Sequence, residues 1–300
     1  MYSQSNIRHH ANKRKNIYAT DLLRDNLFID NYQGFFTLFK ANKIKNMKLS
    51  AYIVTLNEEA RLPKTLEAVK QVADEIIIVD SGSTDKTEEI AKKYGCKFMF
   101  HKWKNISSQK NFAQGQCEND YLLRLDADEV LSPKLIEEIK EIKKNPEYPL
   151  YIIKHRDMFP GDEKPKLFAD GDESIRLYDK RVATMPDDLT HDRIVVLKEG
   201  LKSKKLKGVI LHYSYLNLYQ FWYKLNMYTD ELVKTAVAQG KTYSKFRLIT
   251  EMPYQFIKYY FVRMKFVQGW NGFIISVSLA YFRFLKIAKW FEYQMMNKKK

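Results

Sequence analysis

Short apolar runs alternate with amphipathic segments over the first half of the chain. Four of the runs predict β-strands, at residues 49–56, 75–80, 97–100 and 121–125. Between them the apolar spacing predicts three helices, at residues 62–72, 85–94 and 108–116. Pro63 lies in the first turn of the first helix, and Gly95 follows the second, as is usual at helix ends. The alternation predicts an α/β fold: a mostly parallel sheet with helices on both faces.

Polar residues follow three of these strands. The three polar segments are Asn57-Glu58, Asp80-Ser81-Gly82 and Asp126-Ala127-Asp128. In open parallel sheets, ligands bind beyond the carboxyl ends of the strands. We therefore expect these segments to line one crevice.

Two carboxylates, Asp126 and Asp128, stand at the end of the fourth apolar run. Burying carboxylates is costly unless a cation or hydrogen bonds compensate, so this position indicates a divalent ion. An extended Asp-x-Asp segment directs both side chains to one face, and carboxylate oxygens are ligands that Mg²⁺ and Mn²⁺ prefer. The alternative is that both residues begin a loop and cap the helix after Ser132 and Pro133.

The segment after the second strand predicts a tight turn. Asp80 can accept hydrogen bonds from a ribose or a base, and Ser81 and Gly82 let the backbone approach a nucleotide. The alternative is a type I turn with Asp80 as helix cap. The sequence has neither a Gly-x-Gly-x-x-Gly segment nor a complete Gly-x-x-x-x-Gly-Lys-Ser/Thr phosphate loop. A metal on the Asp pair is therefore the natural partner of a diphosphate.

Four motifs follow one another between residues 54 and 129. They are Val54-Thr55-Leu56-Asn57-Glu58-Glu59, the segment 74–87, Trp103 with Gln109-Lys110-Asn111-Phe112-Ala113, and Leu125-Asp126-Ala127-Asp128-Glu129. In this order they resemble glycosyltransferase family 2, in particular the branch related to lipopolysaccharide-core glucosyl- and heptosyl-type transferases. The resemblance extends from residue 48 to the C-terminus. It implies a GT-A fold, a nucleotide-diphosphate sugar donor (UDP being the commonest), Mg²⁺ or Mn²⁺ on the Asp-x-Asp motif, and inversion at the anomeric carbon.

The resemblance also implies roles for residues of the donor site. Thr55, Leu56 and Glu58 match positions that hold the base and ribose, and Asp80 and Ser81 continue that pocket.

Further matches concern the diphosphate and the metal. Lys110 matches a basic position that faces the nucleotide, and Asp126 and Asp128 match positions that bind ribose and metal-diphosphate, with Asp128 our first choice for direct coordination. Arg176 is a candidate partner of the diphosphate or of an acid. His212, in a His-Tyr-Ser segment that the branch shares, is expected to complete the metal site; the alternative is a hydrogen-bonded structural histidine.

An inverting transfer needs a general base for the acceptor hydroxyl. The branch has a His-Glu pair where this sequence has His191 and Asp192, so Asp192 is the expected base with His191 beside it to orient it. The shorter carboxylate departs from the family pattern. Asp187 and Asp188 are rivals, although Pro186 makes them good turn formers.

The net charge of +15 is concentrated at the two ends of the chain. Residues 1–48 carry nine Lys or Arg against three acids, and residues 241–300 carry twelve against two, whereas the middle is close to neutral. A neutral centre with basic, aromatic-rich ends favours an anionic membrane surface as partner over nucleic acid. The charge alone also fits a non-enzymatic basic protein that binds RNA or membrane, and paired Asp residues also fit a metal-dependent nucleotidyltransferase.

Three long segments in the last third predict helices rich in aromatic residues. The stretch from Trp270 to Leu285 carries one charge, Arg283, and is shorter than a membrane span needs, so we expect amphipathic helices that lie in the membrane interface; the alternative is that they complete the core. The predicted division is a poorly ordered or mis-assigned extension at 1–47, a GT-A domain at 48–215 and a helical region at 216–300. Two cysteines and a polar N-terminus fit a cytoplasmic enzyme, peripheral on the inner face of the membrane.

Overall fold

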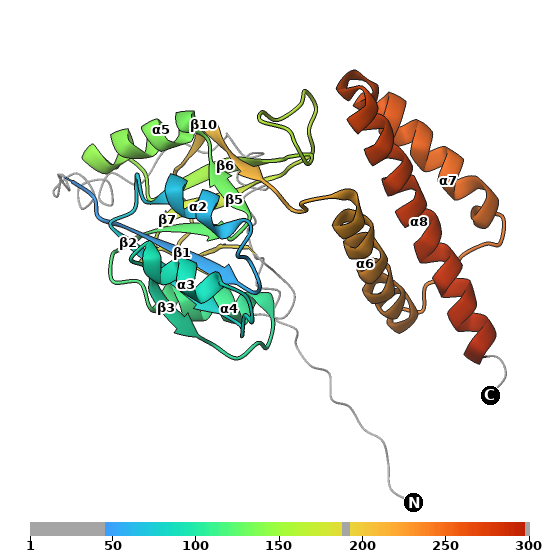
Figure 1. Ribbon diagram of the computed structural model, residues 1–300, viewed down its shortest axis with the longest axis horizontal. Coiled ribbons are helices and arrows are strands. Elements are labelled where there is room, and N and C mark those ends of the chain that lie inside the picture. The colour runs from blue at the N-terminus through green and yellow to red at the C-terminus, as the bar shows by residue number, and fades with distance from the viewer. Residues whose placement is uncertain (1–45, 188–192, 298–300) are drawn as a thin grey trace, which may run out of the picture.

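The computed structural model describes residues 46–187 and 193–297. Its centre is an eight-stranded sheet in the order β3-β2-β1-β4-β7-β6-β10-β5 (Figure 1). The strands are β1 (Leu49–Thr55), β2 (Glu75–Asp80), β3 (Lys97–Phe100), β4 (Tyr121–Asp126), β5 (Glu129–Leu131), β6 (Leu150–Asp157), β7 (Glu173–Asp179) and β10 (Ser203–His212). A separate pair joins β8 (Ala183–Thr184) to β9 (Val195–Val196). The predicted extension at 1–47 falls almost entirely outside the described residues.

The first half of the sheet has the predicted α/β pattern. Strands β3, β2, β1 and β4 are parallel neighbours. The helices that connect them are α2 (Leu62–Val69), α3 (Thr87–Lys93) and α4 (Ile106–Gly115). The expected alternation of strands and helices is therefore confirmed, with helix ends that differ from the prediction by a few residues.

Apolar side chains of the central strands cover both faces of the sheet. In β1, Ala51 and Ile53 belong to the larger hydrophobic cluster, which also contains Leu66 of α2. Tyr52, between them in sequence, belongs to the smaller cluster with Ala113 of α4. Because neighbouring side chains on a strand point to opposite faces, the continuous apolar run of β1 reflects burial on both sides.

The second half of the sheet is mixed. Strand β7 is antiparallel to β4 and β6, and β5 is antiparallel to β10, whereas β6 and β10 are parallel. Helix α5 (Pro133–Lys144) packs closely on β10, since a Cβ on Gly208 would lie 2.4 Å from the Cα of Leu135. The β5–β10 pairing sets His212 opposite Glu129. The end of β10 is thereby brought beside the Asp-x-Asp segment.

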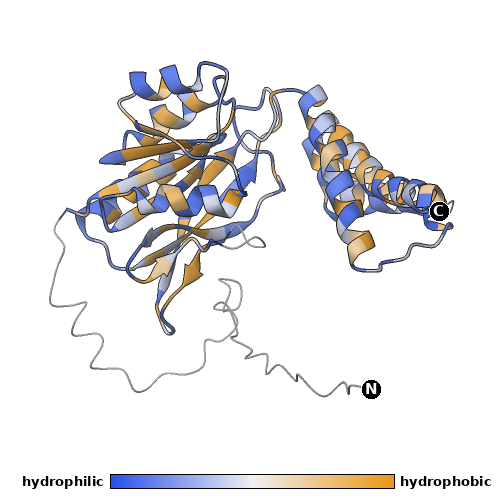
Figure 2. Ribbon diagram, turned by 90° about the horizontal axis from the view of Figure 1, so that it is seen from below, coloured by the Kyte–Doolittle hydropathy of each residue, from blue (hydrophilic) through white to orange (hydrophobic). Residues whose placement is uncertain are grey.

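The last third of the chain forms a helical lobe beside the sheet (Figures 1 and 2). We use this name for α6 (Leu218–Ala238), α7 (Arg247–Ile257), the π-helix η1 (Lys258–Val262), the 3₁₀-helix η2 (Lys265–Gln268) and α8 (Trp270–Asn297). Helix α8 packs against α6 and α7 and buries small residues, among them Gly272, Ser276 and Ala280. Small side chains allow close approach of the neighbouring helices.

Helix α8 is longer than the apolar stretch from Trp270 to Leu285 suggested. It continues through Lys286 and Lys289 to Asn297 and spans 28 residues. Of the described helices it is the one that has the length and composition of a membrane span, although 28% of its apolar window is buried within the protein. Length and composition alone are weak support, because a core helix passes the same test.

Candidate active site

A cavity of about 590 Å³ lies at the carboxyl ends of β1 and β4, between the sheet and the helical lobe. Many of the residues that the sequence predicted for the donor and metal sites line it. They are Thr55, Leu56, Glu58, Ser81, Asp126, Asp128 and His212. Three further predicted residues, Asp80, Lys110 and Arg176, are buried and are not among the described residues that line the cavity. The polar residues at the carboxyl ends of the parallel strands therefore lie together, as expected.

Asp80 organises the turn after β2. Its carboxylate accepts hydrogen bonds from the Thr55 hydroxyl at 2.7 Å, from the Gly82 and Ser83 amides at 2.8 and 2.7 Å, and from the Ser83 hydroxyl at 2.6 Å. These bonds join the ends of β1 and β2. Asp80 thereby fixes Thr55 and Ser81, which face the cavity.

Asp126 lies close to three buried basic residues, Lys110, Arg124 and Arg176. One oxygen is 2.8 Å from Nζ of Lys110, which is buried in α4. Burial raises the pKa of Asp126, but the charges of Lys110, Arg176 and Arg124 outweigh burial and hold this pKa below its usual range. Asp126 therefore stays ionised.

Arg176 reaches Asp126 through Glu129. Its guanidinium donates two hydrogen bonds to the Glu129 carboxylate, at 2.9 and 3.0 Å, and Glu129 also accepts the Asp126 amide at 2.9 Å. Glu129 therefore links the backbone of the Asp-x-Asp segment to Arg176 and helps to fix its position. In this structure the guanidinium of Arg176 is engaged with an acid, one of the two partners expected for it.

The two acids of the motif have different neighbours. The chain turns at Ala127 and Asp128 after β4 ends at Asp126, so the expected extended geometry does not hold there. Asp128 faces Arg61, whose NH1 is 3.5 Å from Oδ2, while Oδ1 is 3.6 Å from Nε2 of His212. Asp128 is thus the member of the pair that meets the predicted histidine.

Arg61 is a site residue that the sequence interpretation missed. It donates two 2.7 Å hydrogen bonds to Glu58, and its NH1 also reaches the Tyr213 and Ser214 carbonyls at 3.3 and 3.1 Å. Burial raises the pKa of Glu58, and the charge of Arg61 opposes this rise. Its position just before α2 gave no sequence signal for the site, because Asp128, Tyr213 and Ser214 lie far along the chain from it.

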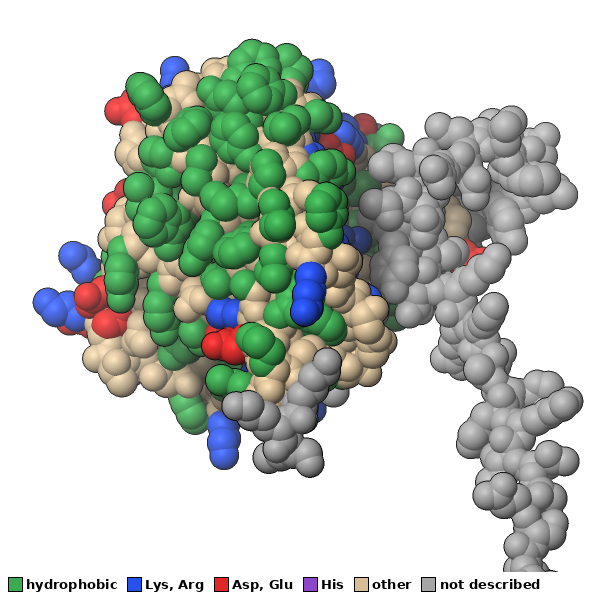
Figure 3. Space-filling model, turned by 90° about the vertical axis from the view of Figure 1, so that its right-hand side faces the viewer, with side chains coloured by type: hydrophobic (Ala, Val, Ile, Leu, Met, Phe, Trp, Pro, Cys, Tyr) green, Lys and Arg blue, Asp and Glu red, His purple; other side chains and the backbone are tan. Residues whose placement is uncertain are grey.

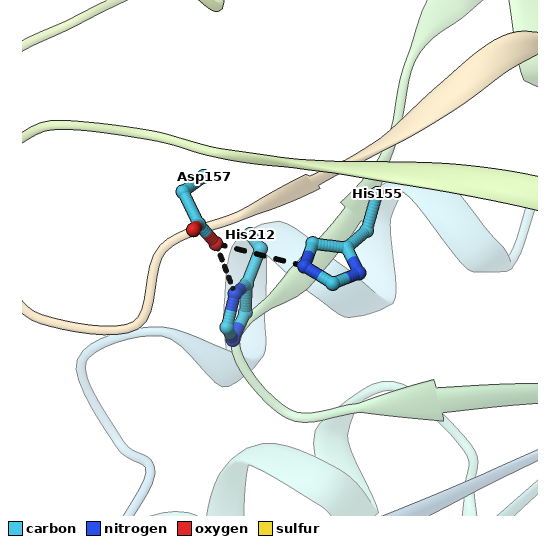
Figure 4. Close-up of side chains that lie close together, drawn as sticks. All are labelled: His155, Asp157 and His212. Carbon is cyan, nitrogen blue, oxygen red and sulfur yellow. Dashed lines mark hydrogen bonds and ion pairs between the residues drawn. The ribbon is translucent and has the colours of Figure 1, made fainter. Parts of the chain in front are cut away.

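His212 belongs to a chain of alternating imidazoles and carboxylates (Figure 4). Oδ1 of Asp157 lies 2.8 Å from His212 Nδ1 and 3.7 Å from His155 Nε2, and the other nitrogen of His155 contacts Asp172. His155, Asp157 and His212 offer donor atoms within 4.8 Å of one another. The sequence interpretation did not identify His155 or Asp157, although both stand at the end of β6.

The acids around His212 govern its protonation. Burial lowers the pKa of His212, but the hydrogen bond to Asp157 and the nearby charges of Asp128 and Glu129 outweigh it and raise the pKa to about 9. The surroundings of His212 therefore stabilise positive charge.

Asp192, the expected general base, and its neighbour His191 lie outside the described residues.

Comparisons with known proteins identify the family of the chain. A sequence model described as Glycosyl transferase family 2 matches residues 50–197. The chain is 42% identical over 252 residues to an uncharacterized glycosyltransferase of Rickettsia typhi, over 81% of this chain and 86% of the relative. It is 31% identical over 253 residues to the lipopolysaccharide core biosynthesis glycosyltransferase LpsC of Rhizobium meliloti, over 82% and 93%. Among solved structures, it is similar to TarS 1–349 of S. aureus at 16% identity and a TM-score of 0.41, over 62% of this chain and 66% of that one.

Both relatives are covered over most of their own length. The expected similarity to lipopolysaccharide-core transferases is confirmed by the match to LpsC. The family match spans β1 to β9, which includes the Asp-x-Asp segment. The chain therefore belongs to glycosyltransferase family 2, and it is a glycosyltransferase with the GT-A fold.

Proposed function

We propose that this enzyme moves a sugar from a nucleotide-diphosphate donor, with UDP-sugars the first to test, to a lipopolysaccharide-core or other lipid-linked or surface saccharide. The transfer is metal-dependent and inverts the anomeric carbon. The observation that carries the proposal is the approach of Asp128 Oδ1 to His212 Nε2 at 3.6 Å, in a cavity that also exposes Thr55 and Ser81.

The donor atoms fit a divalent ion. Two atoms bound to one ion at about 2.1 Å, with bond angles between about 90° and 120°, lie roughly 3.0–3.6 Å apart. Arg61 contacts the other oxygen of Asp128, which leaves Oδ1 for the ion, and Asp157 holds the far nitrogen of His212. When bound, Mg²⁺ or Mn²⁺ would neutralise the charge that develops on the departing diphosphate.

The chain's own residues divide the remaining work. The turn fixed by Asp80 presents Thr55 and Ser81 to the nucleoside, in agreement with the positions that the family resemblance implies for the base and ribose. Arg61 keeps Glu58 and Asp128 in place at the mouth of the diphosphate site. These contacts give the donor a prepared site, which limits the reorganisation needed on binding.

Thermal unfolding with UDP, GDP or ADP, each with Mn²⁺ or with EDTA, tests the donor and the metal. A ligand at a hundred times its dissociation constant stabilises a protein by about 2.7 kcal/mol, which is a visible melting shift. We expect one diphosphate to act only with Mn²⁺, and the Asp128→Asn variant to lose the shift. Asp120→Asn, at the other end of β4, is the matched control and should retain it. No shift with any nucleotide would refute the donor site.

Asp192 remains our candidate for the general base, with His191 as its orienting neighbour. Loss of a positioned base costs about 10²–10⁴-fold in rate. We expect Asp192→Asn to lower kcat by this factor while the nucleotide melting shift is kept. The control is Asp187→Asn, whose carboxylate is exposed and 3.8 Å from Nζ of Lys104. A large loss in the control with none in Asp192→Asn would assign the base to the rival residue.

We also propose that the helical lobe binds an anionic membrane surface. Figure 3 shows hydrophobic side chains over most of its outward face, with Lys and Arg mainly near the margin. Exposed apolar residues are numerous here; Ile249 and Val262 are each 74% exposed. A large exposed apolar face on a basic segment is typical of proteins that bind lipid, and a lipid-linked acceptor would be reached from there.

Flotation of the full chain with vesicles tests this surface. We expect binding to phosphatidylglycerol vesicles, weaker binding to phosphatidylcholine, and loss of binding in an Ile249→Glu, Val262→Glu double variant. Leu197→Glu, at a 56% exposed apolar side chain outside the helical lobe, is the control. Equal binding by the double variant and the control would exclude this face as the membrane contact. The two alternative functions, a non-enzymatic binder and a nucleotidyltransferase, are set aside by the family assignment.

A further inference from the structure

The cavity continues beyond the metal site to a wall that the helical lobe supplies. From α8 this wall takes Asn271, Ile275 and Leu279, which are spaced by four residues and so lie along one side of the helix. The apolar residues that α6 contributes also share one side; they are Phe221, Leu225 and Tyr228. Eight residues of helix span about 12 Å. We call the part of the cavity between α6 and α8 the apolar slot after these mostly apolar side chains; Lys224 and Asn271 also line it.

This slot is built by specific contacts. The β6–β7 loop reaches from the sheet toward α8 (Figure 1) and is tied there by side chains of the helical lobe. Lys265, only 1% exposed, donates to Asp170 at 2.5 Å. Gln268 donates to the Leu167 carbonyl at 2.8 Å. The helical lobe and the loop therefore hold each other across the cavity.

An aromatic stack closes another side. The ring of Phe159, in the β6–β7 loop, meets the ring of Tyr215 edge-on with centroids 6.3 Å apart. Tyr215 in turn stacks on Phe221 of α6 at 4.4 Å. All three residues line the cavity. Their rings therefore form one continuous aromatic wall from the β6–β7 loop to α6.

We propose that this slot is the acceptor subsite and that it takes an amphiphilic glycoside. The acceptor sugar lies at the Asp157 and His212 end, and the apolar aglycone lies between α6 and α8, along Leu225, Ile275 and Leu279. This inference rests on the proposed transfer, because that reaction brings the acceptor hydroxyl to the metal end. It assigns to the helical lobe a part in the reaction beyond membrane attachment.

The lining of the slot argues for an apolar aglycone over a free sugar. The helical lobe also lines the cavity with four polar side chains, but each of them donates a hydrogen bond to another group of the protein; they are Lys224, Lys265, Gln268 and Asn271. Beside them, Leu225, Ile275 and Leu279 offer apolar side chains to the cavity. Free sugars are held by hydrogen bonds, and unpaired hydroxyls against apolar walls are unfavourable. An alkyl or acyl chain gains free energy in the same place.

Photolabelling with a dodecyl glucoside that carries a diazirine on its alkyl chain tests the subsite. The full-length enzyme is labelled with UDP and Mn²⁺ present, and the modified peptides are mapped. We expect labels within 221–228 and 271–279, and competition by unlabelled dodecyl glucoside but not by methyl glucoside. In a Leu225→Gln, Ile275→Gln double variant, labelling should fall by at least about tenfold, because tenfold is the loss expected for one leucine-sized apolar contact and the variant removes two.

Leu197→Gln, at an exposed apolar side chain outside this cavity and outside the helical lobe, is the matched control and should label like the unaltered enzyme. The UDP and Mn²⁺ melting shift is measured for every variant, so that loss of the fold or of the donor site is separated from loss of the subsite. Labels confined to α7, or unchanged labelling in the double variant with an intact melting shift, would overturn the proposal. Labelling of the slot without any nucleotide shift would uphold the subsite and refute the proposed donor.

Discussion

Replacement of Arg176 by methionine should strongly destabilise the fold. Arg176 is 5% exposed and its partner Glu129 is 2% exposed, and two hydrogen bonds of 2.9 and 3.0 Å join them. In the variant, Glu129 stays buried and charged, next to the Asp126 carboxylate, with the Asp126 amide as its remaining described donor. The loss is therefore larger than that of a surface ion pair.

Removal of one partner of a buried ion pair costs about 3–5 kcal/mol, because an uncompensated charge is left in the interior. Total stabilities are about 5–15 kcal/mol, so the variant should unfold at a clearly lower urea concentration. Changing Glu129 to Gln as well removes the buried charge but keeps an acceptor for the Asp126 amide. The double variant should therefore be more stable than Arg176→Met alone.

Urea unfolding at 25 °C, followed by tryptophan fluorescence, gives the free energy of unfolding of each variant. A loss below about 1 kcal/mol in Arg176→Met, the size typical of exposed pairs, would refute the reasoning. So would a double variant that is less stable than the single one. The folded single variant also tests the expected diphosphate role: if UDP and Mn²⁺ still raise its melting temperature as in the unaltered enzyme, Arg176 acts through Glu129.

Three further outcomes are expected. Gly208→Ala should destabilise the protein by about 1–3 kcal/mol in urea unfolding, because the new methyl group collides with the backbone of α5; an unchanged midpoint would contradict this. Burial raises the pKa of Cys96 to about 11 and of Cys117 to about 12, so about one thiol in a thousand or fewer is ionised at pH 8, and a disulfide reagent should label both only after unfolding. Asp157→Asn should weaken Mn²⁺ binding by about 10–100-fold in electron paramagnetic resonance titrations, because Asp157 orients His212; equal affinity would exclude that role.

The parallel half of the fold was predictable because its signals are local. Each strand from β1 to β4 is a short apolar run, and each helix between them has its own spacing and end signals. The polar strand ends followed from the rule that parallel strands finish at one edge. Thr55, Ser81 and Asp128 meet there as expected.

The partners of these residues were not predictable from the sequence. Arg61 precedes α2 and meets Asp128 through tertiary packing, and His155 and Asp157 reach His212 because β6 and β10 are neighbours in the sheet. The antiparallel insertion of β7 between β4 and β6 leaves no periodic signal in the chain. Contacts that depend on the order of the strands in the sheet can be identified only from the structure.

The pairing of β5 with β10 has a consequence for how the enzyme is made. Asp128 leaves the ribosome long before His212, and the strand that carries His212 must pair with β5 before the two residues can meet. Domains fold largely as units during synthesis, and a chain arrested before β10 lacks His212, one of the two residues of the proposed metal site. If Asp128 and His212 hold the ion as proposed, nascent chains gain affinity for it only when the sheet is closed, and metal retention reports completed translation and folding.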